Sequence, residues 1–235
     1  MIQAGATDQF EVLFVCTGNI CRSPIAEQLF RARTNALGGV LSTSSAGTFA
    51  NTGQSMTDQA AAISRNYGGD PSRHRASSVT GSRIEAANLI VTMTRKHRAD
   101  IVSLVPRASR KSFTLRELDR LIGTYRELEP EGWATASAAN VEAFDSFVRG
   151  LASTRGFSMT RVLPTDDDIV DPYRRNQDVY DEAGRLISNS IASLADAFAR
   201  FTLRERSGKD GDKTFGPVTR LDQGPFVEKA QGNDD

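Results

Sequence analysis

Both cysteines of this chain lie in one ten-residue stretch, VCTGNICRSP at positions 15–24. The thiols are Cys16 and Cys21, and Arg22 directly follows the second of them. A thiolate is a strong nucleophile and a metal ligand, while a guanidinium can hold two oxygens of a phosphate or arsenate group in a bidentate fork. The stretch could therefore hold a nucleophile beside an anion clamp, a pair of structural thiols or a metal site.

The metal site is the weakest of these three interpretations. Besides the two cysteines, the chain offers only His74 and His97 as nitrogen ligands, and neither histidine stands at ligand spacing from another ligand. Free cysteines are often simply core residues, but the polar neighbours of these two argue against a purely structural pair. We therefore predict a nucleophile, with no metal and no cofactor.

The residues between Cys16 and Arg22 favour a loop that binds an anion. Gly18 and Asn19 tolerate backbone angles that most residues avoid, so the loop can curl and turn its N–H groups inward. A helix that begins after the loop adds the partial positive charge of its N-terminus. Because these dipoles and Arg22 favour the thiolate of Cys16, the sequence predicts an oxyanion cradle with a sulfur at its floor.

The surrounding pattern predicts a doubly wound, three-layer α/β/α fold with a mostly parallel sheet. Buried strands are expected over residues 11–15, 40–45 and 88–93, alternating with helices over residues 24–33, 57–67 and 95–105. Ser23 is the expected N-cap of the first helix, with Pro24 as its first residue. Such sheets bind ligands at the carboxyl ends of their strands, which is where Cys16 falls.

The rest of the chain adds helices and a tail to a single domain at residues 10–204. The sequence TLRE is a capping box that starts another helix, and residues 118–165 are interpreted as a helical insertion packed on the edge of the domain. A long amphipathic helix is expected from Gln177 onward. Residues 205–235 mix charge, Gly and Pro with few apolar anchors, which predicts a flexible C-terminal tail.

Composition excludes several classes of function. Lys and Arg number 29 and Asp and Glu number 29, so no net charge points to nucleic acid or to an anionic membrane surface. No apolar run approaches the roughly 20 residues that span a bilayer, and residues 1–9 carry no export signal. Two cysteines make no disulfide framework, so we expect a cytoplasmic protein with reduced thiols; its oligomeric state is left open.

The stretch Cys16-Thr-Gly-Asn-Ile-Cys21-Arg22-Ser23-Pro24 closely resembles the active-site loop of low-molecular-weight protein tyrosine phosphatases. The resemblance covers roughly residues 10–118 and 166–203. It includes four further stretches: Ser45-Ala-Gly-Thr48, His74-Arg-Ala76, Leu89-Ile-Val-Thr-Met93 and Asp171-Pro-Tyr173. It implies a phosphatase-I-like fold and a tyrosine-phosphorylated protein as substrate.

The resemblance also implies a catalytic role for each matched residue. Cys16 would be the nucleophile that forms a phosphocysteine, Arg22 would hold the phosphoryl oxygens, and Ser23 would hydrogen-bond the sulfur as it leaves. Asp171 would be the general acid for the leaving oxygen and then the base that activates water.

Other matched residues would shape the cleft and support the loop. The phosphate would be surrounded by Thr17, Gly18, Asn19, Ile20 and Cys21. Asn19, with Ser45 and His74, would hold the loop in its strained shape, and Tyr173 would stack on an aromatic substrate ring. The family places an apolar wall shortly after the Ser-Ala-Gly-Thr stretch; either Phe49 serves as this wall or the wall is missing.

Leaving-group chemistry supports Asp171 independently of the resemblance. A tyrosyl leaving group has a pKa of about 10, so a carboxylic acid held by a rigid Asp-Pro turn would speed its departure by about 10² to 10⁴. The nearby acidic run is expected to be solvated, with each member a backup acid: Asp166, Asp167 and Asp168. Arg174 and Arg175 would make the rim of the cleft basic and favour acidic phosphopeptides or other polyanionic phosphoesters.

Two residues have competing or weaker interpretations. Cys21 either pairs with the nucleophile in a reversible protective disulfide, as in the family, or is a buried inert thiol. His97 lies within the basic stretch Arg95-Lys-His-Arg98 and is expected at the surface.

Two other functions compete with the phosphatase. Arsenate fits the same kind of cradle, but an arsenate reductase of this chain would need an external thiol because no cysteine follows Cys21. A non-catalytic phosphate-binding module fits poorly, since it has no need for Cys16, Arg22 and Asp171 together.

Overall fold

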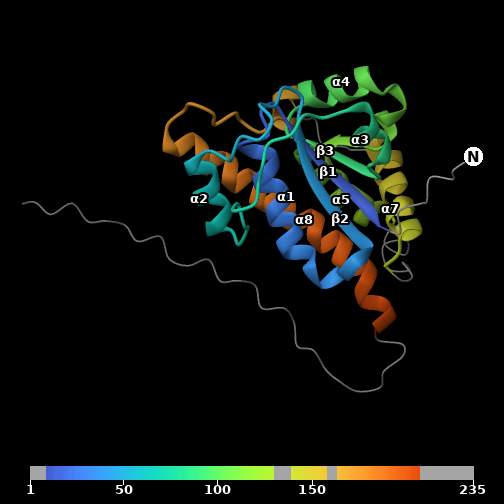
Figure 1. The fold of residues 1–235 in the computed structure, drawn as a ribbon. Coiled ribbons are helices and arrows are strands. Elements are labelled where there is room, and N and C mark those ends of the chain that lie inside the picture. Colours follow the sequence, from blue (N-terminus) through green and yellow to red (C-terminus); the bar gives the residue numbers. More distant parts are fainter. Residues whose placement is uncertain (1–8, 130–138, 158–162, 207–235) are drawn as a thin grey trace, which may run out of the picture.

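Helices cover both faces of a four-stranded parallel sheet in the computed structural model, which describes residues 9–129, 139–157 and 163–206 (Figure 1). The strands are β1 (Phe10–Cys16), β2 (Leu41–Gly47), β3 (Leu89–Thr92) and β4 (Ser112–Thr114). Their order is β2-β1-β3-β4, and every pair is parallel. The crossovers on both sides of β1 give the doubly wound α/β fold that the sequence predicted.

The two faces of β1 bury different sets of side chains. Phe10, Val12 and Phe14 point into the larger core cluster, whereas Leu13 and Val15 point into the smaller one. The larger core is closed by α1 (Arg22–Thr34), α2 (Asp58–Asn66), α5 (Leu115–Leu128), α7 (Val141–Ser153) and α8 (Gln177–Arg206). The smaller core is closed by α3 (Gly81–Ala86) and α4 (Arg95–Leu104). A strand apolar on both faces is what a covered parallel sheet requires.

Short 3₁₀ segments connect several of these elements. They are η1 (Asn35–Val40), η2 (Pro106–Arg110), η3 (Thr154–Gly156) and η4 (Pro164–Asp167). The Thr114 side chain accepts from the Glu117 N–H, and the Glu117 carboxylate accepts in return from the Thr114 N–H, so the predicted capping box is confirmed.

The prediction that Ser23 caps the first helix is wrong. Helix α1 begins at Arg22, and its N-cap position, Cys21, makes no side-chain capping bond. Ser23 is therefore already inside the helix, where its hydroxyl points back toward Cys16 at the strand end. Ser23 matches a capping pattern, but its hydroxyl contacts Cys16 in the loop instead. The loop is short enough to bring the end of β1 and the start of α1 together.

The helical insertion contributes to the main core and does not merely pack on the domain edge. Phe144 and Phe147 of α7 are almost completely buried, and the Phe144 ring packs edge-on against Phe10 of β1 and at a tilt against Phe198 of α8. Phe10 begins β1 whereas Cys16 ends it, so α7 packs at the end of the strand away from the cysteines. The expected packing on the domain edge is corrected for α7, because its aromatic side chains are buried against the central strand.

The domain boundaries at residues 10–204 stay a prediction. Helix α8 extends to Arg206, and the predicted tail lies outside the described residues from residue 207 on. Among the described helices, none combines the length and apolar character that a bilayer span requires.

Candidate active site

The loop from Cys16 to Arg22, named the cradle loop below, joins the carboxyl end of β1 to the start of α1. Backbone hydrogen bonds tie it to the chain that follows β2: Thr48 N donates to Cys16 O and Phe49 N to Thr17 O, both at 2.9 Å. On its other side Thr57 N donates to Ile20 O at 3.1 Å. The loop is held by main-chain contacts from two directions, as a preorganised anion site requires.

Gly47, the last residue of β2, lies directly under the cradle loop. A Cβ atom at this position would come within 2.3 Å of Thr17 O and 3.0 Å of Asn19 N, both backbone atoms. Only a glycine therefore lets β2 end against the loop. The Ser45-Ala-Gly-Thr48 stretch contained this signal, but sequence reasoning did not assign Gly47 a function.

The Cys16 sulfur is buried and surrounded by hydrogen-bond donors. Its side chain is 1% exposed, Sγ lies 3.0 Å from Ser23 Oγ, and Asn19 N donates to it at 3.3 Å. Donors aimed at sulfur stabilise a thiolate both before it attacks and as it leaves. The predicted neighbours of the nucleophile are thus brought together.

Asn19 organises the loop from behind. Its backbone has φ of 55°, the left-handed region that Asn visits more readily than most residues. Its side-chain amide donates to Ser23 Oγ at 3.0 Å and to Ser45 Oγ at 2.8 Å, and His74 Nε2 lies 2.7 Å from its carbonyl oxygen. The predicted support network of Asn19, Ser45 and His74 is present as a set of contacts.

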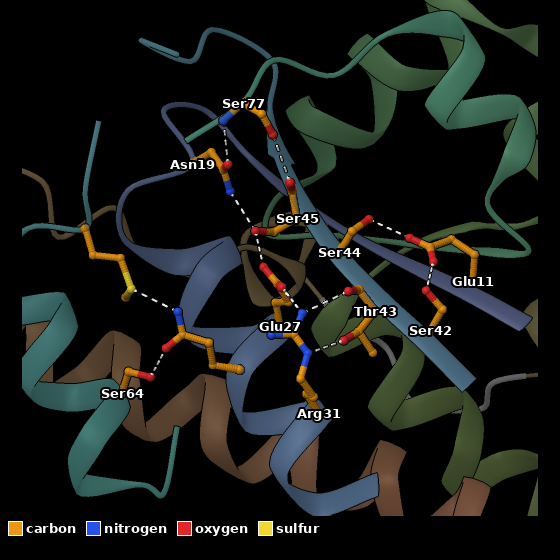
Figure 2. A network of polar contacts seen from close by, with 12 residues as sticks. Glu11, Asn19, Glu27, Arg31, Ser42, Thr43, Ser44, Ser45, Ser64 and Ser77 are labelled. Atoms are coloured by element: carbon orange, nitrogen blue, oxygen red, sulfur yellow. Dashed lines mark hydrogen bonds and ion pairs between the residues drawn. The ribbon is translucent and has the colours of Figure 1, made fainter. Parts of the chain in front are cut away.

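The network continues to residues that sequence reasoning missed. Ser77 N donates to Asn19 Oδ1 at 2.9 Å, and the Ser45 hydroxyl donates to Glu27, which also pairs with Arg31 (Figure 2). Glu27 is a carboxylate only 8% exposed on α1, and the helical pattern alone carried no signal for it. Its two partners compensate the cost of burying its charge.

Arg22 and Asp171 meet across 149 residues of chain. Arg22 Nη2 lies 2.6 Å from Asp171 Oδ2, and Nη1 donates to Ile169 O at 3.1 Å. Arg22 is buried whereas the Asp171 side chain is 54% exposed, so the carboxylate can exchange the guanidinium for another partner at small cost. Arg22 Nε is buried and makes no hydrogen bond among the described residues.

The acidic run before Asp171 was expected to be solvated. In the structure its three carboxylates instead bond to other parts of the chain and anchor the segment. Asp167 pairs with Arg120 at 2.5 Å, Asp168 accepts from Arg95 N at 2.7 Å, and Asp166 accepts from Leu163 N at 2.8 Å. Arg120 and Arg95 come from α5 and α4, which the linear sequence does not bring together with the acidic run, whereas Leu163 is a local partner. The anchors hold the segment that presents Asp171 to the cleft.

A cleft of about 340 Å³ opens beside Cys16. It is lined by Cys16, Thr17, Gly18, Ile20, Cys21, Arg22, Phe49, Asn51, Gln54, Asp171 and Tyr173. Phe49 is 86% exposed and Tyr173 43% exposed, so two aromatic rings are available to a ligand at this surface. Phe49 therefore stands where the wall was expected; Asn51 and Gln54 carried no signal in the sequence.

The surface position expected for His97 is wrong. The residue is 4% exposed, with Nε2 at 2.8 Å from Thr17 Oγ1 and Nδ1 at 2.8 Å from Thr94 Oγ1. Burial, and after it the charge of Arg22, lowers the pKa of His97 to about 4. The basic stretch around His97 predicted that this residue is exposed to solvent. One face of α4 packs on the sheet, however, and the His97 ring lies on that face.

Cys21 is a free buried thiol at the start of α1. Its sulfur lies 3.5 Å from Thr57 Oγ1 and 3.8 Å from Tyr180 OH, and burial raises its pKa. It is therefore held in the protonated form, which reacts slowly. The disulfide with Cys16 stays a prediction.

Within the described part of the chain, no cluster of three or more His, Cys, Asp or Glu side chains could hold a metal ion. The cleft itself is lined by the thiol of Cys16, the guanidinium of Arg22 and the carboxylate of Asp171.

A family model described as low molecular weight phosphotyrosine protein phosphatase matches residues 11–130, about half of the chain. The chain belongs to this family. It is thus a phosphoric monoester hydrolase, and the predictions of family and fold are confirmed.

Relatives of this phosphatase support the same assignment. Low molecular weight protein-tyrosine phosphatase A of Mycobacterium tuberculosis is 39% identical over 122 residues, which are 51% of this chain and 73% of the relative. A protein-arginine-phosphatase of Bacillus subtilis is 37% identical over 109 residues, 46% of this chain and 72% of the relative. The crystal structure of a low molecular weight protein tyrosine phosphatase from T. tengcongensis superposes with a TM-score of 0.56 at 28% identity, covering 80% of this chain and 99% of that one.

Proposed function

We propose that this phosphatase hydrolyses phosphotyrosine in proteins through a phosphocysteine on Cys16. The observation that carries the proposal is the meeting of Cys16, Arg22 and Asp171 on one cleft, with Arg22 Nη2 and Asp171 Oδ2 2.6 Å apart. A nucleophile, an anion clamp and a proton donor within reach of one phosphoryl group are the parts that this reaction needs.

In the first step the Cys16 thiolate attacks phosphorus and the bond from phosphorus to the tyrosyl oxygen breaks. The phosphoryl oxygens replace Asp171 as partner of Arg22, and the free Nε of Arg22 offers a second donor. The released Asp171 carboxylate takes up a proton, from solvent or from the monoanionic form of the substrate. Asp171 then gives this proton to the leaving oxygen.

In the second step a water oxygen attacks phosphorus and the phosphorus–sulfur bond breaks. The Asp171 carboxylate takes the proton of the water, and inorganic phosphate leaves. The departing Cys16 thiolate is received by the Ser23 hydroxyl at 3.0 Å and by the Asn19 N–H at 3.3 Å. Asp171 then gives this proton to solvent and pairs again with Arg22, so the enzyme returns to its initial state with one water consumed.

The walls of the cleft favour an aromatic leaving group. Phe49 and Tyr173 offer rings to stack on, and Ile20 adds an apolar contact. Asp171 is the one carboxylate among the lining residues of the described chain, whereas a phosphoarginine leaves as a cation that a second carboxylate would help to hold. Phosphoarginine peptide is therefore the comparison substrate, given the name of the Bacillus subtilis relative.

Location and partners belong to the same proposal. Both cysteines are free thiols, which supports a reducing, cytoplasmic setting. Arg174 and Arg175 are exposed beside Tyr173 and favour phosphoproteins with acidic residues next to the phosphotyrosine. An arsenate reductase with an external thiol is the alternative.

The test compares wild type, Cys16→Ser and Asp171→Asn on an aryl phosphate, a phosphotyrosine peptide and a phosphoarginine peptide. We expect no turnover by Cys16→Ser and a loss of kcat of about 10² or more in Asp171→Asn. Wild type should prefer the phosphotyrosine peptide. In acid-quenched wild type, the phosphate should be found on Cys16.

Full activity of Cys16→Ser would contradict the mechanism. A preference for phosphoarginine would keep the phosphocysteine and change the substrate, whereas thiol-dependent arsenate reduction without aryl phosphate turnover would favour the alternative.

A further inference from the structure

His97 reaches from the first turn of α4 to the cradle loop, 80 positions earlier in the chain. Its Nε2 atom lies 2.8 Å from the hydroxyl oxygen of Thr17, the residue after the nucleophile. The imidazole is 4% exposed, whereas Thr17 is exposed and lines the substrate cleft. A buried ring thus holds a side chain that a substrate can touch.

The other ring nitrogen is held by Thr94, the N-cap of α4. Thr94 Oγ1 accepts the backbone N–H of His97 at 3.2 Å and lies 2.8 Å from His97 Nδ1. The hydroxyl oxygen accepts the capping bond and can direct its hydrogen to Nδ1. In the tautomer that uses this hydrogen, Nδ1 is the acceptor and Nε2 is the N–H donor.

The ring stays neutral while the enzyme works, since burial and the charge of Arg22 lower the pKa of His97 to about 4. Arg22 and Lys96 oppose its protonation, and Asp100 and Asp171 favour it. A neutral imidazole has one donor and one acceptor, so the two threonines must take opposite roles.

We propose that His97 is a positioning residue that turns the Thr17 hydroxyl hydrogen into the cleft, where Thr17 donates it to a phosphoryl oxygen. The inference rests on the proposed phosphatase function. His97 Nε2–H donates to Thr17 Oγ1, which leaves the hydroxyl hydrogen free to bond a ligand.

The charge of the substrate makes this orientation matter. Phosphoryl oxygens only accept hydrogen bonds, so the opposite ring tautomer would turn a Thr17 lone pair toward the dianion. A bond to a charged oxygen is roughly twice as strong as a neutral one. Thr17 thereby adds a side-chain donor to the main-chain donors of the loop.

The experiment uses full-length enzyme and the variants Thr17→Val, Thr17→Ser, His97→Ala and the pair Thr17→Val with His97→Ala. We expect Thr17→Val to lose about tenfold in kcat/KM on an aryl phosphate and to raise the inhibition constant of inorganic phosphate by a similar factor. Thr17→Ser restores the hydroxyl and should recover most of the activity that Thr17→Val loses. Thr80→Val removes an exposed hydroxyl outside the cleft and is the matched control.

The double variant separates positioning from general packing. If His97 acts through Thr17, His97→Ala should reproduce the tenfold loss, and the double variant should lose no more than either single one. Losses that multiply to about a hundredfold would overturn the proposal. A kcat/KM of Thr17→Val within twofold of wild type would also overturn the proposal. This comparison does not depend on whether any His97 variant folds.

Failure of the proposed function gives a different result. An inactive wild type, or an active Cys16→Ser, speaks against the phosphatase mechanism, whereas an active wild type matched by Thr17→Val speaks against the role of His97 alone.

Discussion

At Gly47 a single missing side chain determines whether the cradle loop can form. The nearest atom to a Cβ built there is the backbone oxygen of Thr17 in the loop, which cannot rotate away as a flexible side chain could. The loop that holds the nucleophile is therefore coupled to the end of β2 by shape.

Gly47→Ala should displace the cradle loop and lower both activity and stability. We expect kcat/KM on an aryl phosphate to fall by more than about tenfold, and the free energy of unfolding to fall by about 1–3 kcal/mol. Steady-state kinetics and urea denaturation measure the two effects. Gly123→Ala is the control. Gly123 lies on helix α5, and a Cβ at this position meets no atom within 4 Å.

A Gly47→Ala enzyme as active as wild type would mean that the loop tolerates the shift. The close contact between β2 and the cradle loop would then have no effect on activity.

The sequence predicted single residues well where a short segment carried the information. Cys16, Arg22 and Ser23 fall within eight positions, so local spacing brings them together in any strand-loop-helix junction. Glu27 and Ser77 were missed, because their contacts with the loop network cross between separate elements.

At the scale of the element, helix α4 carries His97, which the charge pattern of the helix wrongly predicted to lie at the surface. Arg95 and Lys96 do face solvent, yet His97 points inward at the turn nearest the cradle loop. The N-cap threonine and the loop threonine both bond to its ring, so the helix start is part of the site.

Burial of His97 should make stability depend on pH between about 4 and 6.5. The pKa of this imidazole is about 4 in the folded chain, below its ordinary value of 6.5, so the unfolded chain binds the proton first as pH falls. Stability from His97 is therefore present above about pH 6.5 and is lost as pH falls toward 4. The loss amounts to about 3 kcal/mol.

Wild type and His97→Gln are compared by chemical denaturation from pH 7.5 to pH 4. Other groups titrate in both proteins, so the difference between them isolates His97. The stability advantage of wild type should shrink across this range. A difference that stays constant would show that His97 titrates alike in the folded and unfolded chain.

At the scale of the whole molecule, the core is built around aromatic contacts between distant segments. Phe144 of α7 meets Phe10 of β1 and Phe198 of α8 at the end of β1 remote from Cys16. The helix stabilises the central strand without touching the chemistry. The aromatic cluster around Phe144 and the nucleophile Cys16 thus lie at opposite ends of one strand.

Phe144→Ala should destabilise the protein and leave the chemistry intact. Removing a fully buried ring costs about 3–5 kcal/mol, measured as a lower free energy of unfolding or a lower Tm. Below the new Tm, kcat on an aryl phosphate should stay within about twofold of wild type. Leu104→Ala removes a side chain that is 54% exposed and serves as the control.

A Phe144→Ala protein with unchanged Tm would place α7 outside the cooperative core. A large loss of kcat at a temperature where the variant is folded would instead link α7 to the cradle loop.

The sequence by itself determined the alternation of strands and helices and the contents of the cradle loop, because periodicity and local spacing are properties of neighbouring residues. It also marked Asp171-Pro-Tyr173 through resemblance and leaving-group chemistry. Only the tertiary structure decided which distant groups meet. It joined Asp171 to Arg22, turned the acidic run before Asp171 into anchors, buried His97 against Thr17 and brought α7 into the main core. Such meetings depend on how whole elements pack, and packing is chosen by the burial of all their side chains together, which no local pattern contains.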